Sequence, residues 1–182
     1  MIYLRQIENK TDIKNCYKVY KDSFPKFERK PFKFLLKNQK KNIYDLFVIE
    51  DDEHTFFGLA FLVKHNNLVL LDFLAIDKQF QGQKLGTQTL KKLQELYHDK
   101  ILVIEIESTT CGTAKNITQR IRRKGFYLKN NMIKQDFNII LNNCEMEILA
   151  FNGTISFEEY FSIFQMLYNN KKANKYIQLK NK

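Results

Sequence analysis

The chain has 182 residues and a formal net charge of +10, and 44% of its residues are hydrophobic and 14% aromatic. This length and apolar content are enough to bury a full core. They predict one globular domain that spans residues 1–182 and has no linkers or repeats. Because no window approaches about 18 consecutive apolar residues, the sequence predicts neither a membrane span nor a membrane partner.

The cysteines and histidines show no metal-binding or disulfide pattern. Cys16, Cys111 and Cys144 are odd in number and share no CxxC spacing. The histidines lack the spacing of metal ligands as well. These features predict a cytoplasmic, metal-free protein whose thiols are reduced.

The first half of the chain predicts helices and then strands. Residues 2–7 alternate polar with apolar side chains and indicate a first strand. A helix is expected to follow, with Thr11 or Asp12 as its N-cap and Pro25 at its end. A second, basic helix is expected over residues 32–40. Runs of β-branched and aromatic residues then predict consecutive, antiparallel strands over residues 44–51, 55–64 and 67–77.

The second half of the chain contains a βαβ unit. An octapeptide, QFQGQKLG, joins the strand that ends at residue 77 to a helix over residues 85–97, and the apolar run 101–107 predicts a buried parallel strand. Another helix is expected around residues 117–128, and Ser156 with Glu159 forms a capping box for a last helix. With two more strands over residues 132–140 and 144–151, the fold class is mixed α/β.

The octapeptide, residues 79–86, has the composition of an anion-binding turn. A turn from a strand into a helix presents free backbone N–H groups and the positive end of the helix dipole, and glycines such as Gly82 and Gly86 let the backbone approach a phosphate. The dinucleotide fingerprint GxGxxG would need glycine where Lys84 and Thr87 stand, and a P-loop would need glycine, lysine and a hydroxyl residue in a row. Both of those nucleotide motifs are therefore excluded.

The octapeptide resembles the pyrophosphate loop of the GNAT superfamily of acyl-CoA-dependent N-acyltransferases. That loop begins with arginine or glutamine, often has glycine at its second position, has glycine at its fourth position, and ends with glycine or alanine at its sixth. This chain departs from the pattern only at the fourth position, where Lys84 replaces glycine. The resemblance continues upstream in LLDFLAIDKQF and downstream in RRKGFYLKNNM, and it spans nearly the whole chain. The sequence is identified as a bacterial-type member, a single N-acetyltransferase domain with a basic C-terminal tail over residues 170–182.

The resemblance implies a mostly antiparallel sheet with splayed central strands, acetyl-CoA as co-substrate and no metal. The backbone of the central strand would lie beside the pantetheine arm, and the loop would hold the pyrophosphate. Lys84 is expected in the first helical turn, with its side chain extended toward the phosphates or water. The implied CoA-binding residues are Leu74, Ala75, Ile76, Gln81, Gly82, Gln83, Lys84, Leu85, Gly86 and Thr87.

The same resemblance suggests the catalytic residues. Tyr127 falls on the position that commonly protonates the CoA thiolate, and a phenol with an ordinary pKa of about 10 can serve this purpose. Asp72 and Glu107 lie near the usual positions of a base that takes a proton from the amine. For each carboxylate, a role in a structural ion pair stays equally open.

Other functions and the acceptor remain open at this point. The net charge and the acid-free stretch over residues 108–135 suggest a nucleic-acid-binding module as one alternative, although no interleaving of aromatic and basic residues supports it. A second alternative is a relative that binds acyl-CoA but has no catalytic activity. The acceptor is expected to be a small-molecule or peptide amine, with pocket residues near Phe27, Phe32 and Phe34. The protein is expected to be a monomer or a homodimer.

Overall fold

The strands of the protein form a mixed sheet flanked by helices. The computed structural model describes residues 1–110, 114–168 and 170–180, so Cys111 lies outside the described residues. Its eight-stranded sheet has the order β1-β2-β3-β4-β5-β7-β6-β8, in which β4 and β5 pair in parallel and the other registered pairs are antiparallel. The predicted mixed α/β fold is confirmed.

Contacts divide the chain into two compact units, Met1–Lys64 with Leu71–Leu96, and His65–Leu70 with Tyr97–Lys182. The expectation of a single domain stays a prediction. The elements up to α3 are β1 (Tyr3–Gln6), α1 (Lys10–Ser23), α2 (Phe32–Lys40), β2 (Tyr44–Glu50), β3 (Phe56–His65), β4 (Leu68–Ile76), the 3₁₀ turn η1 (Lys78–Phe80) and α3 (Leu85–Leu96). The remaining elements are β5 (Ile101–Glu107), α4 (Ile117–Lys129), β6 (Ile133–Leu141), β7 (Cys144–Phe151), α5 (Phe157–Leu167), α6 (Asn170–Tyr176) and β8 (Ile177–Leu179).

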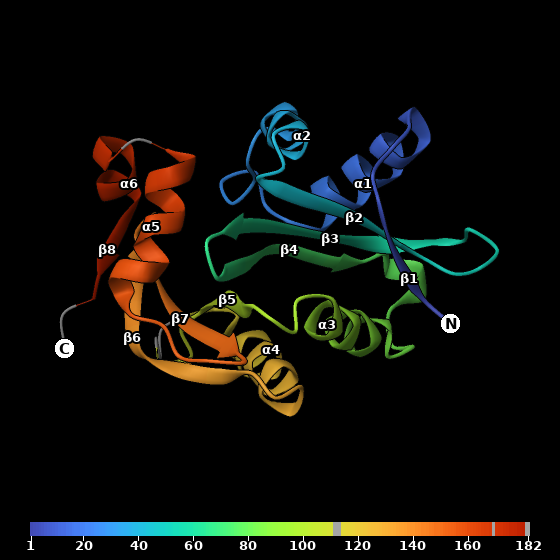
Figure 1. Cartoon of the computed structure of the whole chain (residues 1–182). Coiled ribbons are helices and arrows are strands. Elements are labelled where there is room, and N and C mark those ends of the chain that lie inside the picture. The colour runs from blue at the N-terminus through green and yellow to red at the C-terminus, as the bar shows by residue number, and fades with distance from the viewer. Residues whose placement is uncertain (111–113, 169, 181–182) are drawn as a thin grey trace. The chain divides into compact units, whose positions relative to one another are not determined.

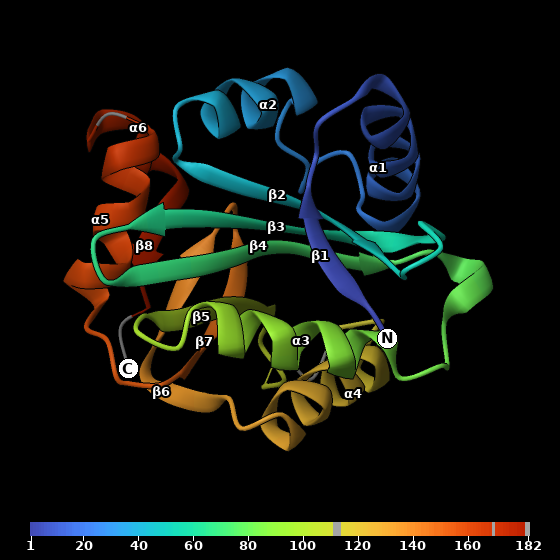
Figure 2. The same cartoon turned by 45° about the vertical axis from the view of Figure 1, so that its right-hand side comes forward.

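In the first unit, α1 and α2 cover one face of strands β2 and β3, and α3 lies on the opposite face (Figures 1 and 2). The start of α1 differs from the prediction, because the N-cap is Asn9 rather than Thr11 or Asp12. Asp12 instead completes a capping box, in which its side chain accepts from the Asn9 backbone. The helix ends at Ser23, as expected for a chain with a proline two residues later.

In the second unit, the parallel strand of the βαβ unit is confirmed, since Leu68 pairs with Ile101 and Leu70 with Val103. The helix expected around residues 117–128 is also confirmed as α4, but Ile121 is 57% exposed. The residue of α4 that is buried is Tyr127. The spacing of apolar residues therefore predicted the helix but does not show which of its residues is buried.

The end of the chain is folded rather than extended over its described part. Residues expected only as a basic tail form α6 and β8, and β8 pairs antiparallel with β6. Lys180, which follows β8, forms an ion pair with Glu145. Residues 181–182 lie outside the described residues.

Candidate functional site

The connection between β4 and α3 is an exposed loop on a short, well-anchored turn. The sequence predicts a direct passage from strand to helix, but η1 intervenes, and the Asp77 side chain caps it by accepting from the Gln79 N–H at 3.2 Å. Gln81 then fastens the loop to the end of the strand, because its Nε2 donates to the Ile76 carbonyl at 3.0 Å. Residues 81–84 are exposed, and α3 begins at the buried Leu85.

Gly82 occupies the most open position of this loop. Its φ is +84°, in the left-handed region that favours glycine, and a Cβ placed there would meet no atom within 4 Å. Its backbone is therefore fully accessible from the side on which a side chain would otherwise stand. This accessibility fits a ligand that has to approach the main chain closely.

Lys84 also has a left-handed backbone, with φ of +59°. The expectation that it lies in the first helical turn is wrong, because it directly precedes α3 and its carbonyl accepts the first helical bond, from the Gln88 N–H at 3.1 Å. A lysine at such a φ carries a strain of roughly 1–2 kcal/mol that glycine avoids. The loop thus has a glycine-type conformation at the position where the resemblance departs from glycine.

The N-terminus of α3 directs unpaired donors toward the loop. Since the first helical bond is donated by Gln88, the N–H groups of Leu85, Gly86 and Thr87 have no acceptor within the helix. The helix dipole adds a positive potential at the same place. Together with the exposed main chain of Gly82, these groups can bind a phosphate or pyrophosphate.

The strand that leads to the loop is held closely by its neighbour. A Cβ on Gly58 of β3 would come within 2.1 Å of the Ala75 carbonyl oxygen, and the Asp77 N–H donates to the Phe57 carbonyl at 2.8 Å. Gly58 therefore permits the close approach of β3 to β4 where the CoA-binding residues Leu74, Ala75 and Ile76 are predicted. Sequence reasoning missed Gly58, although an isolated glycine inside a strand pattern is the usual sign of close backbone approach.

Asp72 of β4 is engaged in an ion pair. Its carboxylate accepts from Lys30 Nζ at 2.7 and 2.6 Å and from the Tyr44 hydroxyl at 2.8 Å. The side chains of Asp72 and Lys30 are only 8% and 15% exposed. A role of Asp72 as a base requires that one of these donors be displaced.

Lys30 anchors the segment between α1 and α2 to the sheet. Besides its ion pair, its backbone N–H donates to the Tyr20 hydroxyl at 2.8 Å, and the same hydroxyl donates to the Lys30 carbonyl at 3.2 Å. Phe73 adds an edge contact with Tyr20, at 4.8 Å between ring centroids. No local pattern signals Lys30, because its partner lies 42 residues away.

Tyr127 of the second unit is a buried phenol. It is 8% exposed, and burial raises its pKa to about 12 in spite of the opposing effect of Arg123. No described residue forms a hydrogen bond with its hydroxyl, whereas buried tyrosine hydroxyls usually have a partner. At neutral pH this group is therefore protonated and able to donate.

Glu107, on β5, forms ion pairs with α4. Its carboxylate lies 2.8 Å from Arg120 Nη2 and 3.2 Å from Arg123 Nη1, and it also accepts from Asn116. On the same strand, Glu105 accepts from the Tyr160 hydroxyl at 2.6 Å. These contacts fit the structural alternative that the sequence left open for Glu107.

The family of the chain follows from a comparison with known proteins. Residues 13–116 match the acetyltransferase (GNAT) family, which is more than half of the chain, and the match contains β4, the loop and α3. The chain belongs to the GNAT acetyltransferase family. A search of curated proteins gave no match.

Solved structures of other GNAT proteins share the fold of this acetyltransferase at low sequence identity. A putative GNAT acetyltransferase from Bacteroides thetaiotaomicron has a TM-score of 0.76 at 15% identity, over 95% of this chain and 98% of that chain. The ribosomal-protein-S18-alanine N-acetyltransferase from Escherichia coli has a TM-score of 0.62 at 18% identity, over 87% and 97%. A spermidine N-acetyltransferase from Vibrio cholerae, solved with CoA and spermine, has a TM-score of 0.60 at 12% identity, over 82% and 94%.

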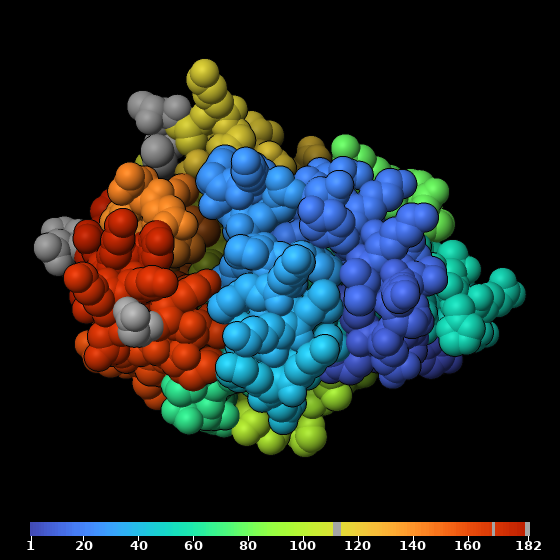
Figure 3. All heavy atoms as spheres, turned by 90° about the horizontal axis from the view of Figure 1, so that it is seen from above, coloured from blue at the N-terminus to red at the C-terminus, as the bar shows by residue number. Residues whose placement is uncertain are grey.

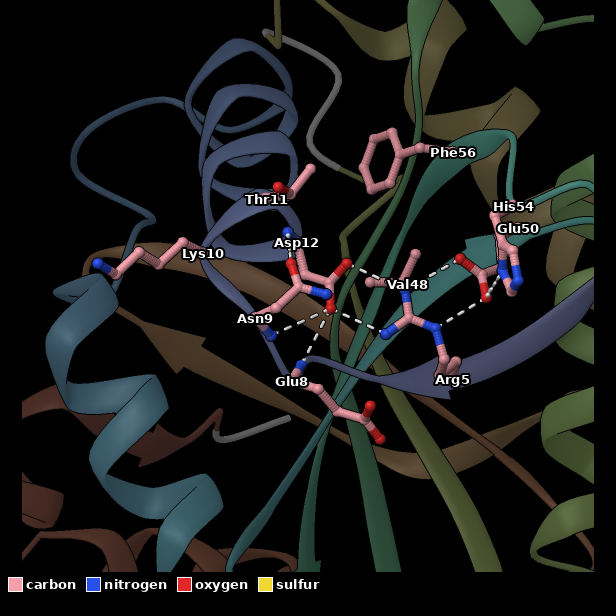
Figure 4. A pocket seen from close by; sticks show the side chains of 10 residues that line it. All are labelled: Arg5, Glu8, Asn9, Lys10, Thr11, Asp12, Val48, Glu50, His54 and Phe56. Carbon is pink, nitrogen blue, oxygen red and sulfur yellow. Dashed lines mark hydrogen bonds and ion pairs between the residues drawn. The ribbon is translucent and has the colours of Figure 1, made fainter.

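This acetyltransferase also has a cavity of about 770 Å³ beside β1 and the start of α1 (Figure 4). Arg5 crosses it and bonds Glu50 through Nε and Nη2, at 2.8 and 3.0 Å, and Asp12 through Nη1 and Nη2, at 2.8 and 3.0 Å. His54 lies 3.2 Å from Glu50. Because these charges satisfy one another, we treat the cavity as part of the scaffold.

Within residues 1–110, 114–168 and 170–180, no group of three or more His, Cys, Asp or Glu side chains could hold a metal ion. In the same part of the chain, no helix has the length and apolar character needed to cross a membrane.

Proposed function

We propose that the protein transfers an acetyl group from acetyl-CoA to a primary amine by direct attack in a ternary complex. The observation that carries the proposal is the exposed loop at residues 81–84, which brings an open glycine and the free N–H groups of α3 to one place. Acetyl-CoA would supply the thioester carbonyl that the amine attacks. The acceptor amine belongs to a small molecule or a peptide.

In this proposal the first unit binds and orients the co-substrate. The N–H groups of residues 85–87 and the main chain of Gly82 hold the pyrophosphate, and Gln81 keeps the loop in position through its bond to Ile76. The backbone of residues 74–76 lies beside the pantetheine arm, as an added strand would. Holding both reactants in this way supplies much of the rate enhancement, because attack then becomes effectively unimolecular.

We further propose that Tyr127 protonates the departing thiolate. Support comes from its motif position and from its buried hydroxyl, which lacks a partner among the described residues. A thiol with a pKa of about 8.5 needs only a weak acid nearby, so a phenol of higher pKa can serve. The motif position of Tyr127 and the burial of its hydroxyl are both properties of the second unit alone.

Of the two candidate bases, Asp72 fits the proposed site better. It lies on the same strand as Leu74 and Ala75, two residues before Leu74 and three before Ala75, or about 7 and 10 Å along the strand. An incoming ammonium could displace Lys30 from the carboxylate and then give up its proton. The oxygens of Glu107 are shared among Arg120, Arg123 and Asn116, which fits a structural role.

Calorimetric titration with CoA and acetyl-CoA tests the binding part of the proposal, and thiol release over a panel of amines tests the catalytic part. Binding of both ligands together with turnover of at least one amine is the expected result. Binding without turnover on any amine would instead indicate a non-catalytic relative. Absence of binding would remove the proposal for the loop.

Replacement of Gly82 by alanine is expected to weaken CoA binding by about tenfold or more, because the added methyl group enters the space of a charge-assisted hydrogen bond. The positive φ makes the same variant less stable by roughly 1 kcal/mol. Gly125→Ala is the matched control, since its Cβ also meets no atom within 4 Å but stands in α4 without a positive φ. Calorimetry should show unchanged CoA affinity for the control, and equal losses in both variants would contradict the role of Gly82.

Replacement of Lys84 by glycine is expected to leave CoA affinity within a few-fold and to stabilise the fold by up to about 1 kcal/mol, because it relieves the left-handed backbone. Lys84→Ala removes the same charge and keeps the strain, so denaturant unfolding of the two variants separates the effects. A large loss of CoA affinity in both variants would show that the lysine side chain is the main phosphate ligand.

A further inference from the structure

The unpaired basic charge of the protein is not confined to the stretch that the sequence suggests. The acid-free stretch over residues 108–135 contains Arg120, Arg123 and Lys124, but these side chains pair with carboxylates of other segments. The partners are Glu107 for both arginines and Glu147 for the lysine. Three of the seven cations in that stretch are therefore paired, whereas the other four form no ion pair with any described residue: Lys115, Arg122, Lys129 and Lys134.

A longer run of unpaired cations lies on α1, α2 and the segment between them. Exposed lysines follow one another through this segment, with only Asp22 and Glu28 as exposed acids. None of these lysines takes part in an ion pair with any residue that the structure describes. We name them the lysine face: Lys10, Lys14, Lys18, Lys21, Lys26, Lys33, Lys37, Lys40 and Lys41.

The lysine face is organised in two rows. On α1 the lysines recur at positions 10, 14, 18 and 21, and on α2 at positions 33, 37 and 40, so each set follows one side of its helix. With a rise of about 1.5 Å per residue, neighbours in a row stand about 4.5–6 Å apart along the axis. Figure 3 looks onto this surface, where the blue and light-blue atoms of the two helices are contiguous.

Aromatic side chains are exposed within the lysine face. Phe27, between the two helices, is 78% exposed, and Tyr17 of α1 is 44% exposed, with Lys21 Nζ 4.7 Å from its ring centroid. An exposed phenylalanine gains nothing for folding at this position. Next to a row of cations, it provides a surface on which a base can stack.

We propose that the lysine face binds single-stranded nucleic acid. The rows of unpaired cations match a backbone with regularly spaced phosphates, and binding would release condensed counterions. The exposed ring of Phe27 favours a strand with accessible bases over an acidic protein or a duplex, because only unpaired bases can stack on it. This binding is independent of the acetyl transfer proposed above, since the loop at residues 81–84 is a different site.

Fluorescence anisotropy with a labelled polyuridine RNA of about 20 nucleotides tests the proposal on the full chain over a series of KCl concentrations. Wild-type protein is expected to bind, with log affinity falling linearly with log salt. Removing four lysines of the face should weaken binding at least about tenfold and lower the salt slope by about 0.7 for each lysine that contacts a phosphate. This variant combines Lys14→Gln, Lys18→Gln, Lys33→Gln and Lys37→Gln.

The matched control removes the same total charge from other exposed lysines and should change affinity by less than about threefold. It combines Lys91→Gln, Lys129→Gln, Lys171→Gln and Lys175→Gln. Phe27→Ala should weaken RNA binding about fivefold or more without a change in salt slope. Equal losses in the lysine variant and its control would overturn the proposal, as they would show attraction by net charge alone.

Three competitors separate the remaining explanations. Polyglutamate and a duplex of the same length should bind much more weakly than the single strand, and saturating acetyl-CoA should leave RNA binding unchanged. Equal affinity for polyglutamate would indicate an acidic protein partner and overturn the proposal. Displacement of the RNA by acetyl-CoA would place the strand in the loop at residues 81–84 and would overturn it as well.

Discussion

Replacement of Tyr127 by phenylalanine is expected to lower kcat by about a hundredfold or more and to leave CoA affinity nearly unchanged. The variant removes the only proton that this side chain can give to the thiolate, and the ring that packs in the second unit is kept. Because no described residue bonds the hydroxyl, its loss should change the free energy of unfolding by less than about 0.5 kcal/mol. Steady-state rates, CoA titration and denaturant unfolding measure the three quantities.

The pH dependence of kcat gives a second test of Tyr127. Burial raises its pKa to about 12, so the phenol stays protonated over the whole range in which an acceptor amine loses its proton. The rate should therefore rise with pH as the amine becomes neutral and should fall only as the pH approaches 12. A decline that begins near pH 10 would contradict a buried acid.

Tyr160→Phe is the matched control for this variant. Tyr160 is also buried, but its hydroxyl donates to Glu105 at 2.6 Å, so its removal should cost stability by about 1–3 kcal/mol. Its kcat should stay within about twofold of the wild type after correction for folded protein. If instead Tyr127→Phe keeps the wild-type kcat, Tyr127 is not the proton donor.

Local signals in the sequence predicted most of the fold because they act within a few residues. The capping box of Ser156 and Glu159 was predicted and is present at the start of α5. At α1 the same type of signal was ambiguous, since Asn9, Thr11 and Asp12 are all capping residues. Only the structure shows that Asn9 caps the helix and that Asp12 takes the third position of the box.

The folded C-terminus could not be predicted in this way. Residues 170–179 carry no strong apolar periodicity, and the short β8 is stabilised by pairing with β6 rather than by its own pattern. The buried contacts of this segment come from Ala173 and Ile177, two residues in a run of lysines and asparagines. Tertiary pairing thus overrides a composition that is typical of a tail.

The candidate site was predictable only where it is contiguous in sequence. The loop was found because its glycines and its helix start lie within one octapeptide, and the left-handed conformation of Lys84 was missed because lysine rarely adopts it. The ion pair of Lys30 with Asp72 was missed because a pairing across 42 residues leaves no spacing to detect. The lysine face was missed for a related reason, since ion pairing elsewhere decides which cations remain free.

The largest expected effect on stability is that of Arg5→Met. Arg5 is the shared partner of Asp12 and Glu50, whose side chains are 8% and 6% exposed, so its removal leaves two buried carboxylates without their cation. Breaking a buried pair in this way costs roughly 3–5 kcal/mol, and we expect a loss of about 3 kcal/mol because Arg5 itself is 30% exposed. Urea unfolding at neutral pH measures this loss of stability.

Arg122→Met is the control for Arg5→Met. Arg122 is exposed and forms no ion pair with any described residue, so its replacement should change stability by less than about 0.5 kcal/mol. Adding Asp12→Asn and Glu50→Gln to Arg5→Met should recover part of the loss, because the buried charges are then neutral. Equal stability of the two methionine variants would show that the Arg5 contacts contribute nothing.

The pH dependence of stability separates the charges of this cluster from its packing. Hydrogen bonds from Arg5 lower the pKa of Asp12 to about 2 from an ordinary value of 3.8, and they lower that of Glu50 as well. A carboxylate with a depressed pKa stabilises the folded state above its unfolded pKa, and this contribution is lost as the pH falls through the folded pKa. The wild type should therefore lose about 2 kcal/mol from Asp12 between pH 4 and pH 2, whereas Arg5→Met should lose little there, since its unpaired carboxylates favour the protonated form. A stability difference between the two proteins that stays constant down to pH 2 would assign the effect of Arg5 to packing alone.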